Sequence, residues 1–358
     1  MIFQHDRFSA SGPVWVPASC KDKDNVKDIV RVIDKKFSSF IGNIIDVNKV
    51  KGLEINSSNF MIRGSLKSIV IKLIDDEASS SFDNQRQIYH HIKHMSLPGP
   101  IILGEDDGDL LGQPFIVMEF IPGRFFTGST EDLFLSANAI QDMHKGFSNH
   151  DGLSFTELQV LQSDANQILS DFIKNKDGWS AKFDKNLLST LEKNINLLIE
   201  IEAKCSANLS MMLNEDKSIL HIDLHPHNII VGPSQAVIID VDSLKKVAWP
   251  SALGFCFYKL SRQVIALHGT ENTNYSDLKT FFETITSEYG ASKNIVDLCF
   301  LGGMTEVLRR ILIILEGNLG SKISPWNKVL DIQIKAISEV CFLYEKVFGY
   351  YNKNLEVI

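Results

Sequence analysis

A chain of 358 residues with 44% hydrophobic residues can bury a sizeable core and favours an organisation in two lobes. The net charge of −8 at pH 7 argues against a nucleic-acid partner, because such partners are bound largely by neutralising phosphates with Lys and Arg. Five widely spread cysteines, with no long apolar run and no signal-peptide pattern, indicate a soluble cytoplasmic protein without a membrane partner.

The N-terminal quarter of the chain predicts one helix and then strands. Residues 1 to about 24 lack periodicity, so we expect an extended leader there. The apolar positions of residues 26–40 recur at helical spacing and predict a helix. Residues 50–74 predict three strands, with turns at residues 56–58 and 64–65.

The third of these strands, Ile69–Ile74, carries a lysine among apolar residues. Alternation places Lys72 on one face with Val70 and Ile74. A charged side chain in the middle of a half-buried strand is costly unless it meets an anion. Taken alone, the strand also fits a lysine that extends its ammonium group into solvent, so both interpretations stay open at this point.

The rest of the chain is predicted to be mostly helical after one more strand. Residues 81–95 predict a helix, and Pro114–Gly123 predicts an apolar strand closed by Pro-Gly, with the acidic run 105–109 as a solvated hairpin tip before it. Further helices are expected around residues 131–147, 165–173, 188–198, 255–268, 277–289, 293–316 and 326–348. Three arginines on the last helices, Arg262, Arg309 and Arg310, suit contact with an anionic substrate, although charges on helix surfaces are usually only solvated.

The most informative stretch is residues 219–242, which read ILHIDLHPHNIIVGPSQAVIIDVD. Asp223 and Asn228 stand five positions apart on a loop, and Asp240 follows a short apolar run. If two short strands joined by Gly-Pro-Ser form a hairpin, Asn228 and Asp240 come together at its open end. A carboxylate that orients a hydroxyl nucleophile, with oxygen ligands that hold Mg²⁺, is the layout that phosphoryl transfer needs.

The histidines of the same stretch leave a second interpretation open. His221, Asp223, His225 and His227 alternate as zinc ligands do, which would indicate a zinc hydrolase. That interpretation assigns no role to Asn228 or to the strand that precedes Asp240.

The segments around Asp223, Asn228 and Asp240 resemble the catalytic and metal-binding segments of the aminoglycoside phosphotransferase and choline kinase family, distant relatives of the protein kinases. The resemblance implies an α+β fold with two lobes, as in protein kinases: a small antiparallel-sheet N-lobe at residues 1–122 and a larger helical C-lobe at residues 123–358. It also implies ATP- and Mg²⁺-dependent phosphorylation of a hydroxyl group on a small molecule similar to an aminoglycoside, choline or a sugar. In this resemblance Asp223 is the catalytic base, and Asn228 and Asp240 hold magnesium.

The resemblance also assigns the nucleotide site. Lys72 would hold the ATP phosphates, Met118 would flank the adenine, and the backbone of Glu119 and Ile121 would bond its edge. A turn ahead of the lysine strand would lie over the phosphates. Its expected donors are Ser57 and Ser58.

One departure from the family pattern concerns the partner of Lys72. Gln85 stands where the family has a glutamate, unless Asp83 or Glu77 takes that place. A glutamine hydrogen-bonds a lysine but does not offset its charge. The departure leaves a nucleotide-binding pseudokinase as an alternative. A protein kinase is less favoured because no A-P-E segment follows Asp240.

Overall fold

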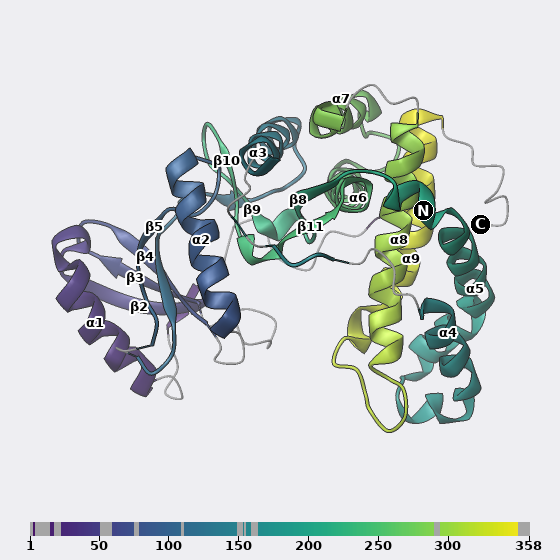
Figure 1. Cartoon of the computed structure of the whole chain (residues 1–358), viewed down its shortest axis with the longest axis horizontal. Coiled ribbons are helices and arrows are strands. Elements are labelled where there is room, and N and C mark those ends of the chain that lie inside the picture. Colours follow the sequence, from purple (N-terminus) through teal and green to yellow (C-terminus); the bar gives the residue numbers. More distant parts are fainter. Residues whose placement is uncertain are drawn as a thin grey trace.

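The computed structural model describes residues 3, 15–17, 23–50, 59–74, 79–108, 111–148, 153, 155–158, 164–289 and 294–349. A sheet with two helices forms one part of the molecule, and the helices from α3 onward form the other (Figure 1). The antiparallel sheet has the order β1-β2-β3-β4-β6-β5. Its strands are β1 (Trp15–Pro17), β2 (Ile44–Val50), β3 (Asn59–Gly64), β4 (Ser68–Leu73), β5 (Ile102–Asp106) and β6 (Phe115–Glu119).

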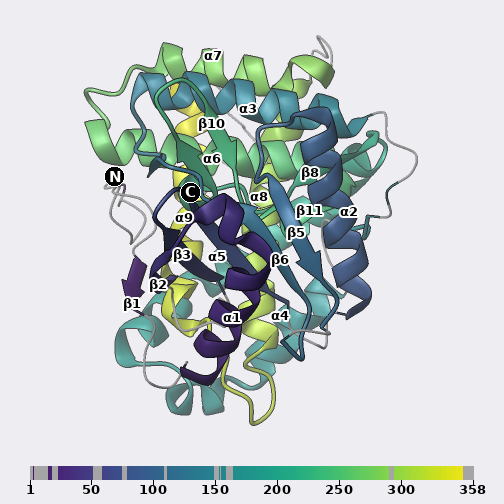
Figure 2. The same cartoon turned by 90° about the vertical axis from the view of Figure 1, so that its left-hand side faces the viewer.

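Two helices, α1 (Lys23–Ile41) and α2 (Ser79–Met95), cover this sheet. Ile69 and Ile71 of β4 are fully buried in one apolar cluster with residues of α1, which lies across that face (Figure 2). Val70 packs with the second apolar cluster on the other face. The alternation expected for this strand is confirmed, so Lys72 points away from α1.

The first expected strand lies earlier than predicted. β2 ends at Val50, where a strand was expected to begin, and the expected turn at residues 56–58 falls outside the described residues. The register between β2 and β3 shifts between Ile44 and Asp46. Such a bulge breaks the two-residue alternation by which a strand is recognised in sequence.

The acidic residues expected at a solvated hairpin tip instead tie the sheet to both helices. Asp106 lies 3.4 Å from Lys36 of α1, and Glu105 lies 2.9 Å from His90 of α2. These contacts connect β5 to the elements on its two sides.

The second part is built from helices and two small sheets. α6 begins earlier than expected, because Pro250 fits the first turn of a helix, where its missing N–H costs no hydrogen bond. The helices are α3 (Thr130–Ser148), α4 (Ala165–Lys174), α5 (Lys185–Leu213), α6 (Trp249–His268), α7 (Tyr275–Thr286), α8 (Ile295–Glu316) and α9 (Asn327–Phe348). The strands are β7 (Arg124–Phe125), β8 (Lys217–His221), β9 (Ile229–Val231), β10 (Ala236–Ile238) and β11 (Leu244–Ala248).

Helices α6 and α8 cross at very short range, and this crossing matters for the site below. A Cβ atom on Gly254 of α6 would lie 2.0 Å from the carbonyl oxygen of Cys299, and one on Gly302 of α8 would lie 2.2 Å from that of Pro250. Only glycine lets the two backbones approach so closely.

The chain passes between the two parts after β6. β6 ends at Glu119, and β7 already pairs with β9 of the second part. Arg124 fixes the start of the second part, because its guanidinium group donates to the fully buried carboxylate of Asp132 at 2.6 and 2.7 Å. Phe3 packs against Phe342 of α9, 5.5 Å between ring centroids, so this residue of the leader contacts the helical part.

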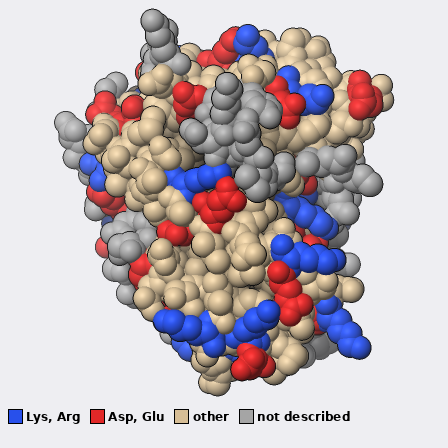
Figure 3. All heavy atoms as spheres, turned by 90° about the vertical axis from the view of Figure 1, so that its right-hand side faces the viewer, with Lys and Arg blue, Asp and Glu red and all other residues tan. Residues whose placement is uncertain are grey.

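The surface carries side chains of both charges, as the 36 basic and 44 acidic residues of the sequence lead one to expect. The face of the helical part shown in Figure 3 carries acidic and basic side chains close to one another. Oppositely charged side chains also pair along the helices, as Lys335 and Asp331 do at 2.7 Å. Among the described residues, no helix is long and apolar enough to cross a membrane.

Candidate active site

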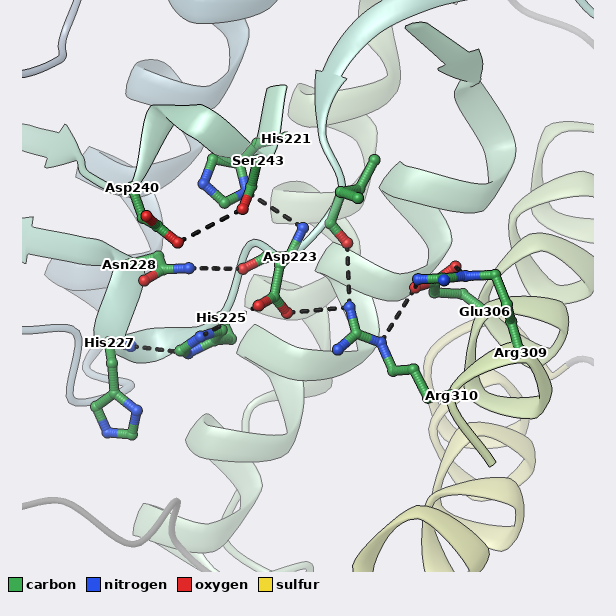
Figure 4. Close-up of polar contacts among 11 residues, drawn as sticks. His221, Asp223, His225, His227, Asn228, Asp240, Ser243, Glu306, Arg309 and Arg310 are labelled. Carbon is green, nitrogen blue, oxygen red and sulfur yellow. Dashed lines mark hydrogen bonds and ion pairs between the residues drawn. The ribbon is translucent and has the colours of Figure 1, made fainter. Parts of the chain in front are cut away.

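The hairpin predicted from the sequence is confirmed and brings two of the expected ligands together. In the β9–β10 pair Ile229 faces Ile238, and the Ile239 N–H donates to the Asn228 carbonyl at 2.9 Å. Asn228, before the first strand, therefore lies beside Asp240, after the second (Figure 4). Asp240 has a φ of 59°, a left-handed conformation that Asp tolerates better than most residues.

His221 braces the loop that carries Asp223. Its Nδ1 accepts from the Asp223 N–H at 3.2 Å, so the ring proton sits on Nε2, which donates to the Ile239 carbonyl at 3.2 Å. Burial lowers the pKa of His221 and keeps the ring neutral, which suits both bonds. This geometry matches a structural role rather than a chemical one.

Asn228 is oriented by the same loop. Its side-chain Nδ2 donates to the Asp223 carbonyl at 2.8 Å. The amide nitrogen is thereby used, and the amide oxygen is the atom left to meet a cation.

Lys72 meets carboxylates of the hairpin end. Its ammonium group forms an ion pair with Asp242 and lies 3.8 Å from Asp240. Burial by itself lowers the pKa of Lys72, but the effects of Tyr89, Asp242 and Asp240 outweigh it and hold the pKa above its usual value. The open question about this lysine is thus resolved: it meets anions rather than solvent.

The carboxylate expected from the second helix is not supplied by Asp83. Its side chain is 70% exposed and pairs with Arg86 at 3.1 Å. Glu77 lies outside the described residues. α2 instead places the buried Tyr89 near Lys72, four residues beyond Gln85 and thus on the same face of the helix, one turn away. Sequence reasoning missed Tyr89.

A cavity of about 280 Å³ unites most of the expected site residues. Its wall is mainly apolar, and Lys72 and Tyr89 line it together with residues 118–121, the hinge at which the chain passes between the two parts, and with residues of the β9–β10 hairpin. The expected residues that line it are Lys72, Met118, Glu119, Ile121, Asn228 and Asp240. Asp223 is not among the lining residues, but its carbonyl accepts a hydrogen bond from Asn228, which is. Ser57 and Ser58 lie outside the described residues.

Asp242 carries a buried carboxylate oxygen of the kind that a divalent cation would satisfy. Its Oδ2 pairs with Lys72, while its Oδ1 is buried and has no hydrogen-bond partner in the described part of the chain. Together with Asn228 and Asp240, which line the cavity, this residue would offer hard oxygen donors, the ligands that Mg²⁺ prefers.

Asp223 is flanked by a cation from α8. Arg310 Nη2 donates to Asp223 Oδ1 at 3.0 Å. Burial raises the pKa of Asp223, but nearby positive charge, that of Arg310 above all, outweighs this effect and holds the pKa below its usual value. The carboxylate is therefore ionised at neutral pH.

The other two arginines singled out in the sequence are structural. Arg262 is buried and donates to Glu339 at 2.8 Å, and Arg309 donates twice to the buried Glu306.

The histidines of the loop point in different directions (Figure 4). His221 faces Ile239, and His227 packs its ring against Phe125 at 5.2 Å. In the part of the chain that the structure describes, no group of three His, Cys, Asp or Glu side chains is arranged to hold a metal ion. The geometry therefore gives no support to the zinc hydrolase interpretation.

Three solved structures of similar fold are those of small-molecule kinases. Spectinomycin phosphotransferase APH(9)-Ia, in complex with ADP and spectinomycin, has a TM-score of 0.60 at 15% identity, covering 90% of this chain and 98% of its own. Ethanolamine kinase from Plasmodium vivax has a TM-score of 0.55 at 12% identity, covering 91% of both chains. Choline kinase LicA from Streptococcus pneumoniae has a TM-score of 0.53 at 15% identity, covering 88% of this chain and 99% of its own. The expected kinase-like α+β fold with two lobes is confirmed.

Curated protein sequences include no significant match to this chain. The family model described as phosphotransferase enzyme family matches residues 49–244. This range includes the lysine strand, the hinge and the whole loop from Asp223 to Asp240. Because it spans more than half of the chain, the protein belongs to the phosphotransferase enzyme family, as its resemblance implied.

Proposed function

We propose that the protein transfers the terminal phosphoryl group of ATP, with Mg²⁺, to a hydroxyl group of a small molecule. The bond between the γ-phosphorus and the bridging oxygen breaks, and a bond from the acceptor oxygen to the same phosphorus forms. The products are ADP and a phosphate monoester, and the hydroxyl proton leaves by way of Asp223.

One observation carries this proposal. A single cavity runs from the hinge residues Met118 to Ile121 to Lys72, Asn228 and Asp240, so an apolar end and a charged end face each other. The apolar end suits a flat purine, with the backbone of Glu119 and Ile121 as hydrogen-bonding groups for its edge. The charged end suits the phosphates.

At the charged end, the chain supplies both a cation and oxygen ligands. Lys72 orients the phosphates, and Asn228 and Asp240, with the buried oxygen of Asp242, would hold Mg²⁺. The bound metal would neutralise charge on the phosphates.

We also propose Ser57 and Ser58 as further hydrogen-bond donors to the phosphates. Residue 122 is the proposed end of the N-lobe.

Asp223 orients the acceptor. It is held by its N–H bond to His221, by the bond from Asn228 to its carbonyl, and by Arg310 at its carboxylate. With its pKa below the usual value, the carboxylate is a weak base, and its main contribution is the placement of the hydroxyl oxygen in line with the phosphorus. A largely dissociative transition state needs little proton removal before transfer.

Nucleotide binding without catalysis was the alternative that the missing glutamate suggested. Membership of an enzyme family argues against it, and so does Lys72, whose charge is balanced by Asp242 and Asp240 in place of that glutamate.

The test is a thermal-shift titration with ATP and Mg²⁺ on the wild type, on Asp240→Ala and on Asp164→Ala. Asp164 is exposed and makes no capping bond to α4, so its removal controls for the loss of one carboxylate. ATP at a hundred times its Kd stabilises a protein by about 2.7 kcal/mol. We expect a Mg²⁺-dependent shift in the wild type and in Asp164→Ala and none in Asp240→Ala. No shift in the wild type would refute the proposed function.

A further inference from the structure

The acceptor side of the site, where Asp223 meets the hydroxyl group in the proposed function, has different neighbours in two directions. Figure 4 shows Asn228 and Asp240 on one side of Asp223 and Arg310, from α8, on the other. In the proposed function the phosphates and the metal occupy the first side, so the acceptor hydroxyl lies between them and Asp223. Arg310 therefore contacts Asp223 from the side that faces away from the reacting groups.

The two oxygens of the Asp223 carboxylate have different surroundings. Oδ1 accepts a hydrogen bond from Arg310 Nη2 at 3.0 Å. Oδ2 accepts none from the residues that the structure describes, and His225 Nε2, 3.9 Å away, is beyond hydrogen-bond range. The side chain of Asp223 also keeps 36% of its surface exposed. One oxygen is thus held by the protein, and the other is open to a ligand.

The guanidinium group of Arg310 is itself held at several points. Its Nε donates to Glu306 at 3.1 Å, its Nη2 also donates to the Ile222 carbonyl at 3.3 Å, and the ring of Phe255 on α6 lies 4.3 Å from its central carbon. Because Ile222 directly precedes Asp223, one guanidinium group contacts both the loop backbone and the carboxylate. A planar group with these contacts has little freedom to rotate.

The contacts that hold Arg310 are anchored in the core of the helical part. Glu306 is 1% exposed and accepts two further hydrogen bonds from Arg309, at 2.8 and 2.6 Å. Arg310 follows Gly303 by seven positions, about two helical turns, so both residues lie on the face of α8 that meets α6. The place of Arg310 beside the loop is therefore set by buried contacts.

We infer that Arg310 is a positioning residue: by holding Oδ1 of Asp223, it leaves Oδ2 directed at the acceptor hydroxyl. The inference rests on the proposed function and names the oxygen that acts in it. Oδ2 accepts the hydrogen bond of the hydroxyl group and then its proton, while the acceptor oxygen bonds to the γ-phosphorus and ADP leaves. Such placement matters because a displacement of about 1 Å can lower a rate by about a hundredfold.

Two other roles for Arg310 make different predictions. If Arg310 only stabilised the fold, Arg309, which bonds the same Glu306, would matter as much for activity. If Arg310 contacted the transferred phosphoryl group directly, it would act independently of the Asp223 carboxylate. Its loss would then lower the rate further in an Asp223→Asn background.

The experiment measures transfer of the γ-phosphoryl group of ATP to water, so that no organic acceptor is needed. Release of radiolabelled phosphate in the presence of Mg²⁺ gives kcat and the KM for ATP. The proteins are the wild type, Arg310→Gln, the matched control Arg309→Gln, Asp223→Asn and the double variant Asp223→Asn/Arg310→Gln. Arg310→Lys is a second variant, which keeps the positive charge beside Glu306 but lacks the planar fork. A crystal structure of Arg310→Gln gives a readout that does not depend on activity.

We expect Arg310→Gln to lower kcat about tenfold or more and Arg310→Lys to lower it about threefold or more. The KM for ATP should stay unchanged, because Arg310 does not line the cavity proposed for ATP. Arg309→Gln should keep kcat within about twofold of the wild type, and the double variant should be no slower than Asp223→Asn. In the crystal structure of Arg310→Gln, the Asp223 carboxylate should adopt more than one orientation.

Several outcomes would overturn the inference. They are a wild-type kcat in Arg310→Gln or Arg310→Lys, equal losses of kcat in Arg309→Gln and Arg310→Gln, and a further loss in the double variant. A single, wild-type orientation of the Asp223 carboxylate in Arg310→Gln would do the same. A Mg²⁺-dependent ATP shift that persists in these cases would leave the proposed function standing.

Discussion

Replacing Gly254 by alanine tests the helix crossing that holds the acceptor side of the site together. The new Cβ would lie 2.0 Å from the Cys299 carbonyl oxygen and 2.7 Å from the Gly303 nitrogen, both backbone atoms of α8. No side chain can rotate away to relieve such a clash, so the helices must separate by about 1 Å or more. Overpacking of this kind typically costs about 1–3 kcal/mol, and a backbone clash belongs at the upper end or above.

Alanine also has a favourable effect that must be subtracted. In a helix it is preferred over glycine by about 1 kcal/mol. The net loss of stability is therefore about 2 kcal/mol or more, which lowers the melting temperature of a domain of this size by about 4–8 °C.

The assay is thermal unfolding followed by circular dichroism, with Gly178→Ala as the matched control. A Cβ on Gly178 meets no atom within 4 Å, so this substitution should change stability by less than about 0.5 kcal/mol. Equal melting temperatures for the two variants would refute the reasoning, because they would mean that α6 and α8 have room between them.

Two further predictions concern buried ionisable groups. Glu306→Gln should lower the free energy of unfolding, measured by urea denaturation, by about 3 kcal/mol, because it weakens three charge-assisted hydrogen bonds from Arg309 and Arg310. The control, Glu316→Gln, changes an exposed residue and should leave this free energy unchanged. Burial lowers the pKa of His144 to about 3 from 6.5, so the unfolded chain binds a proton there that the folded chain does not. The free energy of unfolding should therefore fall as the pH drops below about 6.5, by up to about 1.4 kcal/mol per pH unit from this group. His144→Asn should flatten this dependence on pH. An unchanged slope would contradict the conclusion that His144 is buried in its neutral form.

The parts of the site that sequence predicts well depend on short-range geometry. Asn228 and Asp240 are joined by one tight hairpin, and the position of Lys72 follows from alternation within a single strand. In both cases a local rule, the turn or the two-residue period, decides where the side chain goes.

The parts that sequence misses depend on packing between distant elements. The orientation of α2 against the sheet decides which of its side chains lies near Lys72, and Tyr89 is one that does. The sequence of α2 alone does not contain that orientation. The bulge in β2 likewise hides a strand whose alternation it interrupts.

Arg310 shows the same limit at its strongest. It lies 87 positions from Asp223 in sequence, and on its own helix it resembles any solvated basic residue. Its place beside the carboxylate follows from the glycine-dependent crossing of α6 and α8, which no single helix reveals. There Arg310 bonds both Asp223 and Glu306, and Glu306 also bonds Arg309. The surroundings of Asp223 are therefore determined by how α6 and α8 pack as well as by the motif that identifies the family.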